Sequence, residues 1–143
     1  GFNLRSTNLN AFLGIRQLKK LNSYIKMRNT NYKKFINCLK PYKNNFHLVK
    51  YNDYNSMSSF ALPFIFKNQE HLKKFCSLLN VNKIEFRPLV SGDLTKQPYL
   101  KKIKINNKFC NIISKKSIYI GNNQFLTSSH FKKLKTILAR TFN

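Results

Sequence analysis

SFALPFIF, residues 59–66, is the stretch that decides the fold class. It is short and almost entirely apolar, so it has no polar face to present to water, and this predicts a strand inside a sheet. Pro63 in its middle lacks the amide proton that a sheet ladder uses, which indicates an edge position or a bulge. The flanking sequence must therefore supply helices that cover this strand.

Upstream, the residues between Asn8 and Pro41 have the apolar period of a long helix, or of two helices with a bend. Ser6, Thr7 and Asn8 offer oxygens that can cap its first turn. Pro41 ends it, since proline has no amide proton and disfavours helix at the residue before it. Two stripes predict that the helix packs on two sides. The first is Leu9, Phe12, Leu13, Leu18, Leu21, Tyr24, Ile25, Tyr32, Phe35, Ile36 and Leu39, and the second is Ala11, Gly14, Ile15 and Leu18.

Downstream, the apolar periods alternate between those of strands and helices, and the long segment 89–102 has neither. The predicted order is helix, strand, strand, helix, strand, loop, strand, helix, which indicates the α+β class, a small sheet with helices packed against it. The further strands are FHLVKY (46–51), KIEFRP (83–88) and SIYIGNN (117–123), and the further helices follow Asn68 and either Thr127 or Ser128.

The composition is strongly basic, with 27 Lys and Arg against four acids and a formal net charge of +23. Such a charge fits a nucleic-acid-binding module, because neutralised phosphates dominate that kind of binding. The lysines are scattered in pairs over the chain without a clustered stripe, however, which argues against nucleic acid as the partner. Lys, Asn, Ile, Phe and Tyr are abundant together, as in proteins from AT-rich genomes.

At 143 residues the chain has room for one domain with a core. No apolar run approaches the roughly 18 residues of a membrane span, and no signal peptide opens the sequence, so we expect no membrane partner and a cytoplasmic location. Three cysteines, Cys38, Cys76 and Cys110, sit among apolar neighbours and are expected to be reduced core thiols.

A complete catalytic centre is not visible in the sequence. Four acids give no paired-carboxylate spacing, three distant histidines give no metal or nucleophile pattern, and no Gly-rich phosphate loop is present. Two polar stretches remain, residues 1–5 and 87–98. Arg87 at the end of a strand, followed by a Gly-containing loop, is a candidate anion clamp, because a guanidinium pairs with phosphate or carboxylate in two-pronged fashion.

These two stretches and a third resemble one family in order along the chain. GFNLRSTNLNAFLGIRQLKKLNSYIKMRNTNY (1–32), IEFRPLVSGDLTKQPYL (84–100) and YIGNNQFLTSSHFKKL (119–134) resemble segments of the DegT/StrS-like pyridoxal-phosphate-dependent nucleotide-sugar enzymes. The resemblance covers essentially the whole chain. It implies the C-terminal part of a fold-type-I aminotransferase, with a linking helix region at 1–42 and a small α+β domain at 43–143. The large domain, with the lysine that carries the cofactor, would precede Gly1.

The resemblance also implies roles for particular residues. Asn3 would contact the phosphate of pyridoxal 5'-phosphate (PLP) in the partner subunit's site of a homodimer, and Arg5 would lie beside that phosphate or the sugar nucleotide. An amide donor near a phosphate dianion makes a strong, charge-assisted hydrogen bond. The remaining candidates, Arg87, Ser91, Gly92 and Gln97, would line the nucleotide-sugar side of the cleft. Many relatives carry a histidine where this chain has Asn123, so no contact of that histidine is carried over.

The implied reaction is transfer of an amino group from a donor such as glutamate to a keto-sugar nucleotide. A sugar 3-dehydratase of the same family, in which a histidine replaces the cofactor lysine, is the alternative, because Gln-Pro loops like the one at 97–98 also occur in that branch. Two rivals remain open. One is a small basic nucleic-acid-binding module, and the other is a noncatalytic remnant that keeps the core stripes but has no use for Asn3 or Arg87.

Overall fold

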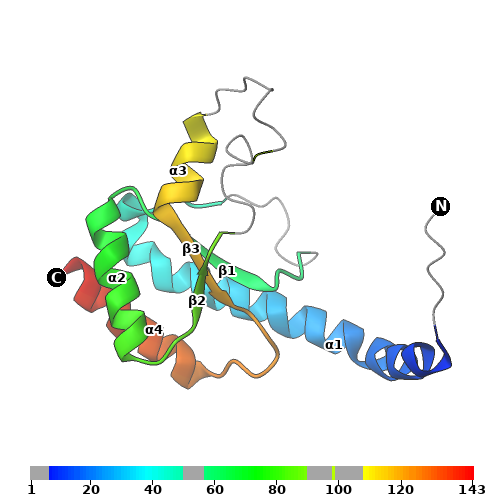
Figure 1. Ribbon diagram of the computed structural model, residues 1–143. Helices are drawn as coiled ribbons and strands as arrows, with labels where there is room; N and C mark the ends of the chain where they lie inside the picture. The colour runs from blue at the N-terminus through cyan, green and yellow to red at the C-terminus, as the bar shows by residue number, and fades with distance from the viewer. Residues whose placement is uncertain (1–6, 50–56, 90–97, 99–107) are drawn as a thin grey trace.

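The computed structural model describes residues 7–49, 57–89, 98 and 108–143, and these form an α+β unit, as predicted. Figure 1 shows a long helix, a small sheet and shorter helices beside it. Residues 1–6, 50–56, 90–97 and 99–107 lie outside the described residues. The elements are α1 (Asn8–Leu39), the 3-10 helix η1 (Lys40–Asn45), β1 (Ala61–Ile65), α2 (Gln69–Val81), β2 (Phe86–Pro88), α3 (Lys108–Lys116), β3 (Ser117–Gly121) and α4 (Ser128–Phe142).

The sheet has three strands in the order β1-β3-β2, and both outer strands run antiparallel to β3. The prediction of a strand at SFALPFIF is confirmed, but β1 lies at an edge of the sheet and not inside it. The edge position that Pro63 indicated is therefore confirmed. Pro63 lies opposite Tyr119 of β3, which in turn lies opposite Arg87 of β2.

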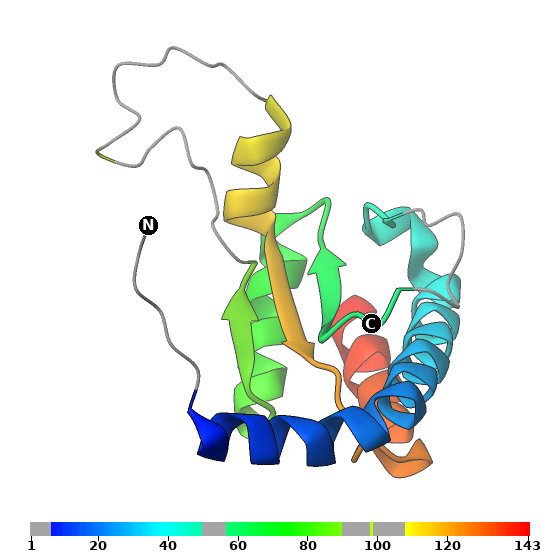
Figure 2. The ribbon, with the colours of Figure 1, turned by 90° about the vertical axis from the view of Figure 1, so that its right-hand side faces the viewer.

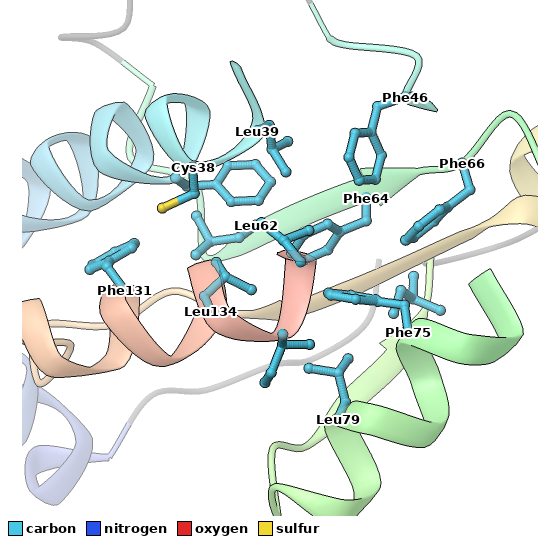
Figure 3. Packing of buried hydrophobic residues seen from close by; sticks show 14 of the residues in the cluster. Cys38, Leu39, Phe46, Leu62, Phe64, Phe66, Phe75, Leu79, Phe131 and Leu134 are labelled. Atoms are coloured by element: carbon cyan, nitrogen blue, oxygen red, sulfur yellow. The ribbon is translucent and has the colours of Figure 1, made fainter. Parts of the chain in front are cut away.

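One face of the sheet carries the core. Successive side chains of a strand point to opposite faces, and Leu62 and Phe64 of β1 are buried while Pro63 between them is only partly so. Figures 1 and 2 show α2 and α4 on the same side of the sheet, and in Figure 3 the rings of Phe64, Phe66 and Phe75 meet between β1 and α2. The Phe64 and Phe75 centroids are 4.8 Å apart. Tyr119 and Arg87 share the opposite face with Pro63.

Helix α1 begins and ends where the sequence predicted. Thr7 is the N-cap, and its side chain accepts a hydrogen bond from the backbone N–H of Asn10 at 3.3 Å. The α-helix ends at Leu39, and Pro41 falls in the first turn of η1. The second half of α1 packs into the core, whereas the first half is exposed, and the second stripe predicted on it contacts no described residue closely. The exposed apolar side chains of α1 are Leu9, Phe12, Leu13, Ile15, Leu18, Leu21 and Met27.

The two shorter amphipathic helices follow their predicted caps. Asn68 caps α2 by accepting from the backbone N–H of Glu70 at 2.8 Å. Thr127 is the N-cap of α4, where its backbone N–H donates to Nδ1 of His130 at 3.1 Å. Each helix turns its apolar residues to the core, because that face alone can be removed from water at little polar cost. The buried residues are Leu72, Phe75 and Leu79 in α2, and Phe131, Leu134, Ile137, Leu138 and Thr141 in α4.

Two further expectations were wrong. FHLVKY is not a strand over its described residues, because only Phe46 pairs, in an isolated bridge with Phe66. Two backbone hydrogen bonds flank this bridge, from the His47 N–H to the Ile65 carbonyl at 2.8 Å and from the Lys67 N–H to the Asn45 carbonyl at 3.0 Å. A helix, α3, also precedes β3 where none was predicted. Leu48 and Val49 have no strand partner among the described residues, and a strand without a partner does not form.

Candidate functional site

Arg87 is the one predicted site residue that the structure describes. It lies in β2, and its Nε and Nη2 atoms both donate to Oε1 of Glu85, at 3.0 and 2.8 Å. The hydrogen bonds from the guanidinium to Glu85 and the charge of that carboxylate raise the pKa of Arg87 above its ordinary value. The two side chains are 67% and 77% exposed. An ion pair this exposed contributes little to stability because water and salt screen it, so a stronger anion can displace Glu85.

A cleft opens beside Arg87 on the side of the sheet that the core does not use. Its volume is about 390 Å³. Tyr119, in the central strand, forms its floor, since it lies directly opposite Arg87 in the ladder. The cleft therefore combines an exposed Arg87–Glu85 ion pair with aromatic surface. Its lining residues are Phe60, Glu85, Phe86, Arg87, Tyr119, Gly121 and Asn123.

A network of buried asparagines holds the wall of this cleft. Asn122, 2% exposed, donates from Nδ2 to the carbonyls of Ser59 (2.8 Å) and Arg28 (3.1 Å), and from its backbone N–H to the Phe60 carbonyl (2.7 Å). Its Oδ1 accepts from Nδ2 of Asn31 at 3.2 Å. Buried amides of this kind stabilise a single arrangement because each lost partner leaves an unsatisfied polar group.

The same network ties α1 to both sides of the cleft. Asn31 of α1 also donates from Nδ2 to the Asn123 carbonyl at 2.9 Å, and Oδ1 of Asn29 accepts from the Ser58 N–H at 2.8 Å. Sequence analysis missed this site feature. In the sequence, Asn29 and Asn31 stand out as polar residues next to the buried stripe of α1. Their positions do not reveal that the hydrogen-bond partner of Asn31 is Asn122, which lies 91 residues further along the chain.

The other predicted site residues lie outside the described part of the chain. These are Asn3 and Arg5 near the start, and Ser91, Gly92 and Gln97 in the loop after β2. The turn that the family resemblance marked, Gly121 to Asn123, is described, and it forms one rim of the cleft beside Arg87.

In the described part of the chain, the titratable side chains away from this cleft form no metal-binding cluster. Among the described residues no group of three His, Cys, Asp or Glu side chains could hold a metal ion. All three cysteines are free, as predicted, and Cys38 is buried while Cys76 and Cys110 are partly buried. Burial raises the pKa values of the Cys38 and Cys76 thiols, which therefore remain protonated and poorly reactive at neutral pH. No helix in the described ranges is both long and apolar enough to cross a membrane.

Comparison with known proteins connects this geometry to one group of enzymes. A model of the DegT/DnrJ/EryC1/StrS aminotransferase family matches residues 1–133. The GDP-4-keto-6-deoxy-D-mannose 3-dehydratase of Escherichia coli O55:H7 is 28% identical over 145 residues, which cover 96% of this chain and 37% of that enzyme. The lipopolysaccharide biosynthesis protein RfbH of Salmonella typhimurium is 27% identical over 91% of this chain and 31% of its own length.

The fold gives the same result. A crystal structure of GDP-4-keto-6-deoxymannose-3-dehydratase with a trapped PLP-glutamate geminal diamine superposes with a TM-score of 0.82 at 27% identity. The superposition covers 96% of this chain and 37% of that one. The chain thus spans about a third of the length of the relatives it matches.

Proposed function

The chain belongs to the DegT/DnrJ/EryC1/StrS aminotransferase family, and from this premise we propose that it forms the C-terminal part of a PLP-dependent enzyme that acts on a keto-sugar nucleotide. In this proposal residues 1–42 are the linking region and residues 43–143 the small domain. One observation carries the proposal: 96% of the chain superposes on a PLP-bound sugar-nucleotide enzyme with a TM-score of 0.82 at 27% sequence identity.

The chain's own residues would bind and orient, and the chemistry at the reacting carbon would come from the cofactor. PLP, when bound, supplies an electron sink for the substrate. Asn3 and Arg5 have side chains that suit the cofactor phosphate. The Asn3 amide donates hydrogen bonds and does not ionise, and the Arg5 guanidinium stays positively charged. We assign these two residues to the site of the partner subunit in a homodimer.

The substrate side would be formed by Arg87 with Ser91, Gly92 and Gln97 of the loop after β2. The Arg87 guanidinium holds the diphosphate of the sugar nucleotide, exchanging its exposed pair with Glu85 for a pair with phosphate. Ser91 and Gln97 have hydroxyl and amide groups that can bind the sugar, and Gly92 allows the backbone to approach closely.

Two reactions are candidates, and each has an observation in its favour. Amino transfer from a donor such as glutamate fits the family's description as aminotransferases. Removal of the sugar 3-hydroxyl fits the relatives from E. coli and Yersinia pseudotuberculosis, both 3-dehydratases of GDP-4-keto-6-deoxy-D-mannose. RfbH, a lipopolysaccharide biosynthesis protein, supports a role in building cell-surface polysaccharide in either case. The enzyme would work in the cytoplasm, where nucleotide sugars are made.

The decisive experiment is cofactor retention. The full polypeptide that carries this chain is loaded with PLP, dialysed at neutral pH and scanned for the absorbance of bound cofactor. We expect the wild type to retain PLP and Asn3→Ala to lose a large part of it, because the phosphate loses a charge-assisted hydrogen bond. Asn22→Ala, on an exposed turn of α1, is the matched control and should retain as much as the wild type.

A wild type that does not retain PLP would contradict the proposed function, and equal retention by Asn3→Ala would remove the assignment of that residue. Product analysis with a GDP-linked 4-keto-6-deoxy sugar and glutamate then separates the two reactions. An amino sugar indicates transfer, and a sugar without its 3-hydroxyl indicates dehydration.

A further inference from the structure

A groove between α1 and the turn that follows β3 has no role in the assignments above. Its volume is about 310 Å³, and the residues that line it include Lys26, Thr30 and Lys34 of α1 and Gln124 and Leu126 of the turn. We propose that this lysine groove binds an extended acidic segment of another protein, with two acidic side chains four residues apart and an apolar side chain midway between them. The inference goes beyond the proposed function and does not depend on it.

The two lysines lie at opposite ends of the groove. Lys26, Thr30 and Lys34 follow one another at intervals of four residues, so they lie along one side of the helix. At a rise of about 1.5 Å per residue, Lys26 and Lys34 are about 12 Å apart along the helix axis. The Lys34 ammonium lies 5.8 Å from the centroid of the Phe131 ring in α4, which keeps it at its own end. A ligand with two anionic groups at a similar separation therefore matches this pair.

Neither lysine is neutralised within the described part of the chain. Lys26 and Lys34 are exposed and form no ion pair with a described residue. The two described acids lie elsewhere, because Glu85 pairs with Arg87 and Glu70 lies in the first turn of α2. The positive charge at both ends of the groove is therefore available to an anion from outside.

A second copy of this chain is a poor occupant. The chain has 27 Lys and Arg against four acids, so two copies repel each other. The acids are Asp53, Glu70, Glu85 and Asp93, and no two of them are four residues apart. Charge complementarity therefore favours an acidic segment that belongs to a different protein.

The middle of the groove combines apolar surface with hydrogen-bonding groups. Met27, which is 45% exposed, and the partly buried Leu126 contribute the apolar surface. The Thr30 hydroxyl donates to the Lys26 carbonyl at 3.0 Å, which leaves its oxygen as an acceptor. The Gln124 side chain makes no hydrogen bond with a described residue, so it can both donate and accept. A peptide uses all of these groups, because its backbone needs hydrogen-bond partners and its apolar side chain gains from leaving water.

The period of an extended peptide matches the spacing of these groups. Every second side chain of such a peptide points to the same side, and residues four apart are separated by about 13 Å. This distance is close to the roughly 12 Å between the two lysines along α1. Acidic side chains at the first and fifth positions meet the two ammonium groups, and the third side chain lies over Met27 and Leu126. In a helical peptide, residues four apart are only about 6 Å apart along the axis, so the groove favours an extended segment.

The turn that forms the second wall is fixed to α1. Asn31 donates from Nδ2 to the Asn123 carbonyl at 2.9 Å and to Oδ1 of Asn122 at 3.2 Å. Oδ1 of Asn123 accepts in turn from the Phe125 N–H at 2.8 Å. Figure 2 shows the chain after β3 reaching α1 before α4 begins. A groove whose two walls are joined in this way loses little ordering entropy when it binds a ligand.

Fluorescence anisotropy with labelled peptides tests the proposal. The probe is the peptide Gly-Glu-Ser-Leu-Ser-Glu-Gly, titrated with the full polypeptide that carries this chain at fixed salt. One control peptide, Gly-Glu-Glu-Leu-Ser-Ser-Gly, has the same charge with its acids adjacent, and a second has serine in place of the leucine. We expect the probe to bind about threefold or more tightly than either control, because each control loses one ion pair or the apolar contact.

Substitutions in the groove test which groups make these contacts. Lys26→Gln combined with Lys34→Gln should weaken the probe by about fivefold or more and remove its advantage over the peptide with adjacent acids. Met27→Ser should weaken the probe and leave the serine peptide unchanged, since that peptide has no leucine to cover. The matched control is Lys132→Gln combined with Arg140→Gln, which removes the same charge at the same spacing from exposed positions of α4. It should leave the affinity within about twofold of the wild type, because salt screens charges outside the groove.

An oligonucleotide of eight thymidines is titrated in parallel, because a basic protein attracts any polyanion. Circular dichroism checks that all variants remain folded. Equal binding of the probe and the peptide with adjacent acids, or equal losses in the two double variants, would mean that charge alone acts and would overturn the inference. So would a full polypeptide that binds no peptide, or tighter binding of the oligonucleotide than of the probe that is lost only in the variant of Lys26 and Lys34.

Discussion

The two halves of α1 differ sharply in how much of their apolar surface is covered. They belong to one uninterrupted helix, Asn8–Leu39, and both carry an apolar stripe. In the second half Tyr32 and Phe35 are each 1% exposed, whereas Phe12 and Leu18 in the first half are 54% and 68% exposed. Figure 1 shows the first turns extending beyond the rest of the molecule.

This difference teaches what hydrophobic periodicity does and does not record. The spacing of apolar residues predicts that one face of the helix is buried, but it does not identify the surface that buries it. For the second half that surface is β1 and α4, within this chain. For the first half no described residue supplies it. Substitutions that remove the same group from each half measure the difference directly.

The largest effect is expected from Phe35→Ala. The Phe35 ring contacts Tyr32 and Phe64 with centroids 5.6 and 5.0 Å apart, so its removal leaves a cavity in the core. We expect the free energy of unfolding to fall by about 3 to 5 kcal/mol, measured by urea denaturation followed by circular dichroism.

Phe12→Ala is the matched control in the exposed half. The Phe12 ring is 54% exposed, and the Arg16 guanidinium lies 4.9 Å from its centroid, so the loss should stay at or below about 1 kcal/mol. Losses of equal size in the two variants would show that both halves are covered in solution and would end the comparison.

An intermediate loss of stability is expected from Asn122→Ala. This substitution tests the hydrogen bonds that join the buried half of α1 to the wall of the cleft. The substitution leaves the carbonyls of Ser59 and Arg28 and the amide of Asn31 without their partner. Each unsatisfied buried group is costly, and we expect a total loss of about 1 to 3 kcal/mol in the same denaturation experiment.

Asn22→Ala removes the same side chain from an exposed turn of α1 and improves helix propensity, so stability should stay the same or rise slightly. If Asn122→Ala were as harmless as this control, the network would not hold the cleft wall.

The smallest effect is expected from Gly14→Ala in the exposed half. Nothing lies within 4 Å of a Cβ atom at Gly14, so the change acts only on the helix backbone. Alanine is favoured over glycine inside a helix by about 0.5 to 1 kcal/mol. Amide hydrogen exchange in residues 10–20 should slow by about two- to fivefold, while exchange in residues 29–39 stays unchanged. Slowing in both halves would mean that they open together.

The elements predicted correctly from sequence are those whose signal is local. Thr7 and Asn68 cap the helices they precede, and Pro41 lies just beyond the end of α1. These features act within one turn of the chain, so a single sequence contains everything they need. The α+β class follows from them, because helices and strands that alternate with apolar faces must form layers.

The failures came from tertiary contacts. The segment at 46–51 looks like a strand, but pairing depends on whether a neighbouring edge is in reach, and only Phe46 finds one. Helix α3 was missed for another reason: it has apolar residues at 109, 110, 112 and 113, a helical spacing, but no element was assigned between the predicted loop at 89–102 and the strand at 117. In the cleft, Arg87 could be predicted from its own chemistry. Tyr119 and Phe60 could not, because their ring contact depends on the order of strands in the sheet.

The sheet carries a proline in each outer strand, Pro63 in β1 and Pro88 in β2, and none in the central strand. A proline offers no N–H to an incoming strand. A second molecule that tried to extend the ladder from either side would thus find a gap in the row of donors. Short strands rich in Phe and Ile are prone to recruit copies of themselves into fibrils. In the described sheet, these two prolines interrupt the row of donors on both outer strands and so disfavour such polymerisation.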